Sequence, residues 1–475
     1  MNNKEAISLD AHLSLAANNN IKPLLRWPSS SFNFAYGGHG RNKSENPDVF
    51  IPINPRFSSI MVRHEDGEMR WQRVEVKPEE HLKFPKFPET TNSSSSSIEL
   101  YDNYHNDYVS SILTKKTPQE KPLWEIHIIN YPTTNAACTM IFKIHHSLGD
   151  GYSLMGALLS CLQRADDPSL PLTFPSRPQL NSNYEDKSLF KRLCFGVNSF
   201  FSSISDFGSS IIKARMIADD ITPIRSGYEG TDSQHFTLSD ISFSLDQIKE
   251  IKSKLGVTIN DVVCGMIFYG LRLYMEEMNE RTKTSNSTAL VMLNLRSIKG
   301  YQSLKEMQKP ESKGLWGNKI SFLQIPIPKA SQSESSNPLE FVWEASDVLK
   351  KKKRSFGVHL IGLLIDLEMK LIGPEAVAKE IYNTIGNSSV LISNMVGPVE
   401  KMALANHPVN GLYFTMTCGP EDVNITIMSY VKILRMTMKT LKGFIDEHKL
   451  KFCMEKAFEV MYKASMEISE IATKN

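Results

Sequence analysis

The chain has 475 residues, of which 41% are hydrophobic and 22% charged, an ordinary composition for a folded protein. This composition excludes a largely disordered, collagenous or coiled-coil chain, and the length predicts at least two domains. Lysine and arginine total 54 against 52 acidic residues, so the net charge of +2 gives no electrostatic reason to expect nucleic acid as a partner. The six cysteines form no CxxC pair and none has a histidine at zinc-finger spacing, so we expect no metal.

The N-terminal segment, residues 1–47, shows no clear hydrophobic period. We therefore expect it to be atypical and without ordered structure. It has no charged stretch followed by an apolar one, as a secretory signal requires. No window of the chain reaches the ~18 uncharged apolar residues that a transmembrane helix needs, so we expect peripheral contact with a membrane at most.

A first domain is predicted over residues 48–167. Tyr104, Tyr108 and Ile112 lie one helical turn apart, and two later segments alternate apolar and polar residues as strands do. A turn sequence at 132–135 joins the two strands as a hairpin. The predicted elements are a helix over 101–113, strands over 123–131 and 139–146, and a helix that starts after residue 151 and ends before residue 166.

A linker or crossover is predicted over residues 168–230. Four prolines lie between residues 168 and 178, which is incompatible with a regular helix or a central strand. Further along, Phe200, Ile204 and Phe207 fall three or four residues apart within the segment 190–217, whose ends carry basic residues. This segment is a candidate amphipathic helix on a membrane surface, and the alternative is that its apolar face packs on the protein.

A second domain is predicted over residues 231–475. Ser244 and Gln247 predict a helix start by their capping-box spacing, and Thr258 begins a longer helix with one apolar face. Both halves mix helices with strands and hairpins, which predicts two α+β domains in contact and a mixed α/β fold class. The other predicted elements are strands over 290–296, 320–327 and 390–393, a helix over 338–354, and a meander of strands over 412–417, 424–430 and 433–439.

The clearest chemical feature is the sequence HHSLGDG at residues 145–151. Consecutive residues at a strand end point to opposite faces, so one of His145 and His146 can face a cavity while the other packs. A neutral imidazole near pH 7 is suited to accept a proton from a hydroxyl group. Gly149 and Gly151 allow a tight turn around Asp150, whose carboxylate can hold the loop or the imidazole. Because no GxSxG motif is present, we infer no covalent intermediate.

HHxxxDG is the signature of acyltransferases of the chloramphenicol-acetyltransferase-like superfamily. Five further short motifs accompany it, and the set in chain order is NPRFSS at 54–59, PLW at 122–124, HHSLGDG at 145–151, IND at 259–261, NLR at 294–296 and SNMVGP at 393–398. In this order, the motifs resemble the plant form of the bifunctional wax ester synthase/diacylglycerol acyltransferase family, and the likeness runs from about Asn54 to the C-terminus.

The resemblance implies two similar-sized domains with a tunnel between them, and transfer of a fatty acyl group from acyl-CoA to a long-chain alcohol or a diacylglycerol. It implies acyl-CoA as co-substrate and no cofactor. It also implies a location at the cytosolic face of the endoplasmic reticulum membrane, with the plasma membrane as a second location. For the histidine loop, the resemblance implies that His146 is the general base, that His145 supports it and that Asp150 has a structural role. It implies that Pro122, Leu123 and Trp124 contact the acyl or alcohol chain. Substrate binding near the active site is implied for Asn260, Asp261, Asn294 and Arg296.

Two questions stay open from the sequence. The thioester oxyanion needs a hydrogen-bond donor, which Asn260 or the Asn294–Arg296 segment could supply, although Asn260 could instead cap its helix.

The second question is the class of protein. One alternative is a condensation-type or BAHD-like acyltransferase for small acceptors, although no carrier domain and no BAHD C-terminal motif is present. The other is a non-catalytic lipid-binding protein, because residues 1–47 differ from the strand-bearing segment with which the family begins.

Overall fold

The computed structural model describes residues 10–17, 54–65, 69–88, 95–173, 217–228, 235–294, 296, 316–329, 337–354, 367, 371, 373–405, 407–417 and 419–468. We call the described residues up to 173 the first half and those from 217 onward the second half. The predicted amphipathic segment 190–217 lies outside the described residues, except for its last residue.

A seven-stranded sheet combines strands from both halves of the chain, in the order β4-β5-β6-β1-β13-β12-β7. The predicted hairpin is confirmed, since β5 and β6 pair antiparallel. The second half contributes β12 and β13, so this sheet contains strands from both predicted domains. The boundaries of those domains stay predictions. The strands are β1 (Asp10–Ala17), β4 (Leu82–Lys83), β5 (Trp124–Ile129), β6 (Thr139–His145), β7 (Gln163–Arg164), β12 (Met402–Leu404) and β13 (His407–Thr417).

Strand β1 lies in the middle of this sheet, between β6 and β13. Leu13 is paired with Phe142 on β6 and with Phe414 on β13, both antiparallel. The expectation that residues 1–47 lack ordered structure is therefore wrong for Asp10–Ala17. The sequence signal was present, because polar residues at 10, 12 and 14 alternate with Ala11, Leu13 and Leu15. Pairing on both sides stabilises a strand whose own pattern is short.

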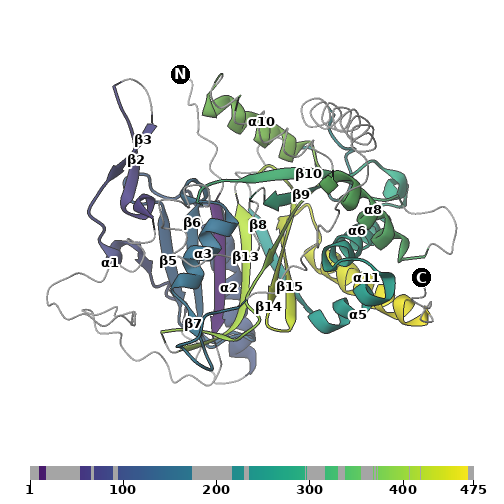
Figure 1. Ribbon diagram of the computed structural model, residues 1–475, viewed down its shortest axis with the longest axis horizontal. Coiled ribbons are helices and arrows are strands. Elements are labelled where there is room, and N and C mark those ends of the chain that lie inside the picture. The colour runs from purple at the N-terminus through teal and green to yellow at the C-terminus, as the bar shows by residue number, and fades with distance from the viewer. Residues whose placement is uncertain are drawn as a thin grey trace, which may run out of the picture.

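Helices cover both faces of the first sheet, α2 (Ser95–Thr114) on one and α3 (Gly151–Ser160) on the other. Ile141 of β6 packs in a cluster with α2, whereas its neighbour Phe142 packs in a cluster with Leu154 of α3. Successive strand residues point to opposite faces, so the two helices lie on opposite sides. Figure 1 shows α3 in front of the sheet and α2 behind it. Both helices were predicted.

A second, six-stranded sheet has the order β10-β9-β11-β14-β15-β8. The predicted meander is wrong in its first strand, because β13 belongs to the seven-stranded sheet, where both its edges are paired with β1 and β12. Only β14 and β15 form a hairpin. The strands are β8 (Phe236–Ser244), β9 (Thr288–Asn294), β10 (Ile320–Pro326), β11 (Val390–Val396), β14 (Val423–Tyr430) and β15 (Ile433–Leu441).

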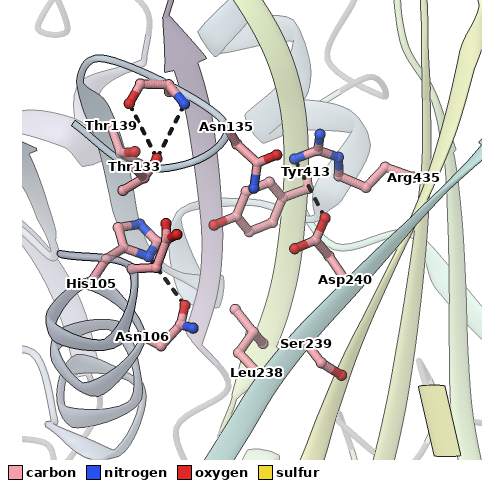
Figure 2. Close-up of a pocket in the computed structure, with 12 residues that line it drawn as sticks. His105, Asn106, Thr133, Asn135, Thr139, Leu238, Ser239, Asp240, Tyr413 and Arg435 are labelled. Carbon is pink, nitrogen blue, oxygen red and sulfur yellow. Dashed lines mark hydrogen bonds and ion pairs between the residues drawn. The ribbon is translucent and has the colours of Figure 1, made fainter. Parts of the chain in front are cut away.

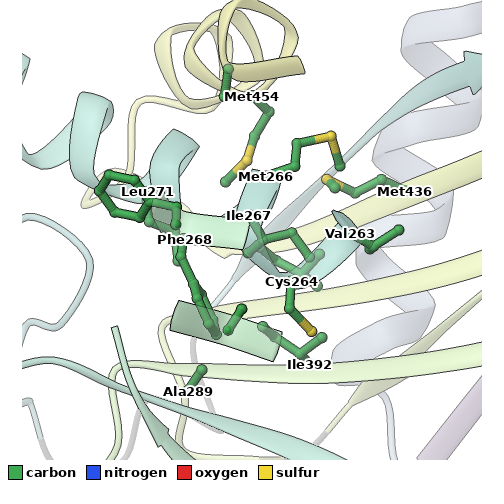
Figure 3. Close-up of a cluster of buried hydrophobic side chains, with 14 of the residues drawn as sticks. Val263, Cys264, Met266, Ile267, Phe268, Leu271, Ala289, Ile392, Met436 and Met454 are labelled. Carbon is green, nitrogen blue, oxygen red and sulfur yellow. The ribbon is translucent and has the colours of Figure 1, made fainter. Parts of the chain in front are cut away.

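The outer face of the second sheet is covered by helices packed around α6 (Figure 1). Figure 3 shows α6 side chains such as Ile267 and Phe268 among Ala289, Ile392 and Met436 from three different strands. A Cβ atom on Gly265 would lie 2.7 Å from the Val342 Cα atom, so this glycine permits close packing of α8 on α6. These helices are α5 (Leu245–Leu255), α6 (Ile259–Met278), α8 (Glu340–Arg354) and α11 (Glu447–Glu467), whereas Ile385 of α10 (Pro374–Gly386) belongs to the cluster that contains Phe142 of β6.

None of the described helices by itself meets both requirements of a membrane span, sufficient length and sufficient hydropathy. Helices α5 and α6 meet them only as a pair, and the pair is bent by 100°.

The inner face of the second sheet meets the first sheet in a shared core. On β9, Ala289 and Val291 pack with α6, whereas Leu290 between them packs with Phe142 and Ile144 of β6. Both faces of β9 are therefore buried, as expected for a strand next to a parallel neighbour. This packing brings the ends of β6 and β9 into the same region of the molecule.

Three further short elements precede α2 in the first half. They are the 3₁₀ turn η1 (Pro55–Ser58), the two-stranded ribbon of β2 (Ser59–Arg63) and β3 (Met69–Arg73), and the single turn α1 (Pro78–His81). The ribbon projects from one edge of the molecule (Figure 1).

Candidate active site

The HHSLGDG sequence forms the connection between β6 and α3. Strand β6 ends at His145, one residue earlier than predicted, and His146–Leu148 form a 3₁₀ turn, η2. The Gly149 amide donates to the His146 carbonyl at 3.3 Å and closes this turn. Asp150 then caps the N-terminus of α3. A strand, a tight turn and a helix start thus lie within seven residues.

The His146 imidazole is partly exposed, although surrounding protein atoms remove much of its hydration. This burial is the main reason that its pKa is lowered from the usual value of 6.5. His145 also lowers the pKa, while the negative charge of Asp150 raises it. The ring is therefore neutral at pH 7, the state in which it can accept a proton.

His145 has a local structural role. Its Nδ1 atom accepts a hydrogen bond from the Ser147 backbone N–H at 3.1 Å and lies 2.8 Å from the Ser147 Oγ atom. Because a backbone N–H can only donate, Nδ1 is unprotonated. His145 thus caps the turn that carries His146, in agreement with the supporting role that the resemblance implies.

Asp150 is completely buried and ion-paired with Arg296, whose Nη1 atom lies 2.6 Å from Oδ2. The other carboxylate oxygen accepts from the Ser153 backbone N–H and hydroxyl group at 3.1 and 3.0 Å. These contacts agree with the structural role that the resemblance implies for Asp150. These bonds join Asp150 to other residues of the protein, and they fix the start of α3 relative to the second half.

The segment Trp316–Lys319 of the second half docks on the same loop. The Lys319 backbone N–H donates to Asp150 Oδ2 at 2.9 Å, and Arg296 Nη2 donates to the Gly317 carbonyl at 2.6 Å. These residues were not predicted as part of the site. A tryptophan, a glycine and an asparagine in a loop before a strand carry no periodic signal, so sequence patterns could not place them here.

The PLW motif lies beneath the histidine loop. The Leu123 carbonyl accepts from the His145 backbone N–H at 3.0 Å. Trp124 stacks on His81 with ring centroids 4.0 Å apart and donates from Nε1 to the Phe57 carbonyl at 2.9 Å. Pro122, Leu123 and Trp124 are all buried. The motif is thus part of the site, and its contact with an acyl or alcohol chain stays a prediction.

The IND motif begins α6, and its Asn260 and Asp261 differ in role. Thr258 is the N-cap and forms a capping box with Asp261, whose Oδ2 atom accepts from the Thr258 backbone N–H at 2.8 Å. Asp261 also accepts from the Ser346 hydroxyl group of α8 at 3.0 Å. The alternative that Asn260 caps the helix is therefore wrong. Its Oδ1 atom instead accepts a hydrogen bond from the Asn394 side chain.

The SNMVGP motif joins this group through β11. Asn394 binds Asn260, and the next residue approaches the histidine loop, since a Cβ atom on Gly151 would lie only 2.9 Å from the Met395 Sδ atom. Gly151 therefore permits the close contact between α3 and β11. The SNMVGP motif thus connects the IND motif to the histidine loop, which also contacts the PLW and NLR motifs.

Asn294 orients Arg296 at the end of β9. Its Oδ1 atom accepts from the Arg296 backbone N–H at 2.9 Å and from Nη1 at 3.2 Å. The guanidinium group further bonds to Asp150, Ser153 and Gly317. Positioning of the loop is the role that these contacts show, and substrate binding by Asn294 and Arg296 stays a prediction.

A polar cavity of about 240 Å³ lies elsewhere, between α2, the β5–β6 loop and strands β8, β13 and β15. Figure 2 shows the Tyr413 ring in this cavity, with Arg435 on one side and His105 on the other. Thr139, which lines it, begins β6, whereas His145 ends the strand roughly 20 Å away at about 3.4 Å per residue. The cavity is therefore separate from the histidine loop.

Comparison with known proteins identifies the family. Residues 105–263 match the wax ester synthase/diacylglycerol acyltransferase catalytic domain, and residues 316–462 match the WS/DGAT C-terminal domain. Wax ester synthase/diacylglycerol acyltransferase 4 of Arabidopsis thaliana is 30% identical over 426 residues, which cover 84% of this chain and 79% of that protein. The chain belongs to the wax ester synthase/diacylglycerol acyltransferase family. Wax ester synthase/diacylglycerol acyltransferase 11 of the same plant is 30% identical over 416 residues, which cover 84% of this chain and 83% of that protein.

Solved structures confirm the two-domain CoA-dependent acyltransferase fold. The wax ester synthase/diacylglycerol acyltransferase from Marinobacter aquaeolei VT8 aligns with a TM-score of 0.55 at 15% identity, covering 97% of this chain and 95% of that one. A starter condensation domain of rhizomide synthetase aligns with a TM-score of 0.51 at 9% identity, covering 98% and 90%. This chain thus shares its fold with both proteins, and the sequence matches place it in the wax ester synthase/diacylglycerol acyltransferase family. The tunnel between the domains stays a prediction.

Proposed function

We propose that this protein transfers a fatty acyl group from acyl-CoA to the hydroxyl group of a long-chain alcohol or a diacylglycerol, with His146 as general base. Family membership supports the reaction, and the neutral His146 imidazole on a rigid loop supports the mechanism. In this reaction the alcohol oxygen attacks the thioester carbonyl carbon and His146 accepts the hydroxyl proton. The carbon–sulfur bond then breaks, and the CoA thiolate takes the proton from His146.

A positioned base contributes roughly 10²–10⁴-fold to such a reaction because an alcohol is a weak nucleophile until its proton is removed. The thioester is already an activated acyl donor, so the proposed reaction needs acyl-CoA as co-substrate and no further cofactor.

Asn260 is our proposed donor to the thioester oxyanion. Its Oδ1 atom accepts from Asn394, and that bond does not use its Nδ2 atom. It lies in the first turn of α6, where the helix dipole favours negative charge. Arg296 is less suited, because its guanidinium group is bonded to Asp150, Ser153 and Gly317.

Peripheral contact with a membrane is the second part of the proposal, at the cytosolic face of the endoplasmic reticulum or at the plasma membrane. Both acceptors are insoluble in water, so a route from lipid to His146 is required. Three large apolar side chains with high exposed fractions support a contact next to the segment 190–217. They are Ile217 (57%), Ile221 (72%) and Tyr228 (63%). An Ile217→Ser/Ile221→Ser variant should float less with liposomes than wild type, and equal flotation would exclude this surface as the contact.

The activity test uses purified protein with palmitoyl-CoA and either hexadecanol or diolein, and detects wax ester or triacylglycerol. His146→Ala should lose ester formation and stay folded. His145→Ala should lose less, about 10-fold, because it acts through the turn, and His145→Asn should recover part of that loss by restoring an acceptor for Ser147. Products formed only from small acceptors would favour the condensation-type alternative. A folded wild type that binds palmitoyl-CoA without turnover would favour the non-catalytic one.

A further inference from the structure

Three consecutive backbone carbonyl groups of the catalytic turn η2 each accept a hydrogen bond from a side chain elsewhere in the chain. The donors are two residues of the second half and one of the first half. The bonds run from Asn318 Nδ2 to the His146 carbonyl (3.0 Å), from Arg56 Nη1 to the Ser147 carbonyl (3.1 Å) and from Trp316 Nε1 to the Leu148 carbonyl (2.8 Å).

The His146 carbonyl accepts from the Gly149 backbone N–H, which closes the turn. Carbonyl groups at the end of a short helix otherwise have no partner within it and are commonly hydrated. Here they bind three different side chains, so the peptide planes on the C-terminal side of His146 are held from outside. On the other side, His145 accepts from the Ser147 backbone N–H. The direction of the His146 side chain depends on these peptide planes, because they fix its Cα–Cβ bond relative to β6.

Arg56 is itself held in place on the first-half side. Its guanidinium carbon lies 5.6 Å from the centroid of the Trp71 ring on β3. Its backbone N–H donates to Asn54 Oδ1 at 3.0 Å in the cap of η1. Arg56 thus reaches the catalytic turn from the start of the β2–β3 ribbon.

The two sides of this arrangement also touch each other. Phe57, next to Arg56, packs edge-on against Trp316, with ring centroids 6.0 Å apart. Trp316 and Asn318 flank Gly317, which binds Arg296. The carbonyl contacts therefore connect both halves of the chain at the residue that is proposed to carry the chemistry.

We propose that Arg56, Trp316 and Asn318 are positioning residues that set the His146 imidazole at the distance and angle needed to accept the hydroxyl proton. This inference rests on the proposed function of His146. Small misplacements of a catalytic group can lower a rate by about 10²-fold. The three residues bond to backbone carbonyl groups of the turn, so their loss should lower kcat and leave KM nearly unchanged.

Trp316→Phe is the sharpest test, because it removes the Nε1–H donor and keeps an aromatic ring against Phe57. We expect kcat for palmitoyl-CoA and hexadecanol to fall about 10-fold, with both KM values within about twofold and the unfolding midpoint close to that of wild type. Arg56→Met should show the same pattern, and Arg56→Lys should recover part of kcat because it keeps a donor. Trp343→Phe, the same change at an exposed position on α8, is the matched control and should behave as wild type.

A double variant separates positioning from a general structural effect. Adding Trp316→Phe to His146→Ala should cause no further loss of turnover, since the tryptophan acts through the histidine. Wild-type kcat in Trp316→Phe, or an additive loss in the double variant, would overturn the proposal.

A chemical readout keeps this test separate from the proposed activity. The rate at which diethyl pyrocarbonate modifies His146, measured by mass spectrometry, should change in Trp316→Phe and not in Trp343→Phe. If wild type makes no ester, the proposed function fails, and an unchanged modification rate would then show that the positioning role fails as well.

Discussion

Asp150 and Arg296 lie 146 residues apart in the chain, yet Oδ2 of one and Nη1 of the other are 2.6 Å apart, with exposed side-chain fractions of 0% and 2%. The pair connects the N-cap of α3 to the end of β9. Such a buried pair stabilises poorly compared with an apolar pair, but removing one partner leaves an unpaired buried charge. We therefore interpret it as a device that fixes how the second half docks on the histidine loop.

Asp150→Asn should lower the free energy of unfolding by about 3–5 kcal/mol, because it leaves the Arg296 guanidinium buried without its counter-charge. Chemical denaturation measures this loss. Arg296→Gln should lose a similar amount, and the double variant should lose clearly less than the sum. As a control, Asp246→Asn at the exposed pair with Lys249 should leave stability unchanged. A variant of Asp150 with normal stability and a purely kinetic defect would contradict the structural role.

The pH dependence of kcat/KM should report the lowered pKa of His146. The base must be neutral, so activity should rise with pH and reach half its maximum below pH 6.5. The same burial makes protonation of His146 unfavourable to folding, so its contribution to stability is present above pH 6.5 and is lost as pH falls through its lowered pKa. A pH–rate profile from pH 4.5 to 8.5 and denaturation of wild type and His146→Ala test both statements. A midpoint above 6.5 would exclude His146 as a base desolvated in this way.

Asp261 and Asn260 are neighbours with different expected phenotypes. Asp261→Asn weakens the capping box and the bond to Ser346, so we expect a loss of about 1–3 kcal/mol in stability with unchanged KM. Asn260→Ala should mainly lower kcat, by about 10²-fold if it supplies the oxyanion donor. Steady-state kinetics and denaturation of both variants check this division. The opposite pattern would assign Asp261 to substrate binding, as the family resemblance implies.

Leu13→Pro should prevent stable folding of the first sheet. Proline removes a backbone donor, and β1 pairs on both sides, so the change should cost about 3 kcal/mol or more. Soluble yield and cooperative unfolding are the measurements. Met69→Pro, in the exposed β2–β3 ribbon, is the control and should be tolerated better. Equal behaviour of the two variants would mean that β1 is not needed in the sheet.

Several features could be predicted from the sequence because they depend on residues close together in the chain. Alternation predicted the β5–β6 hairpin, and Thr258 was correctly predicted to begin α6. The HHxxxDG sequence indicated the acyltransferase class, since its turn, its cap and its histidine pair lie within seven residues. Interactions of this range appear directly in the pattern of the chain.

Only the tertiary structure placed the elements that come from far away. Strand β1 was missed, because one short alternating segment is stabilised mainly by the neighbours on either side. Strand β13 was recognised as a strand but assigned to the wrong sheet. The contacts of Trp316 and Asn318 with the catalytic turn had no sequence signal, because a single side-chain donor leaves no period. Local patterns predicted most of the elements, and the resemblance carried by HHxxxDG indicated His146 as the base, whereas long-range pairing and packing decided what holds the histidine loop in place.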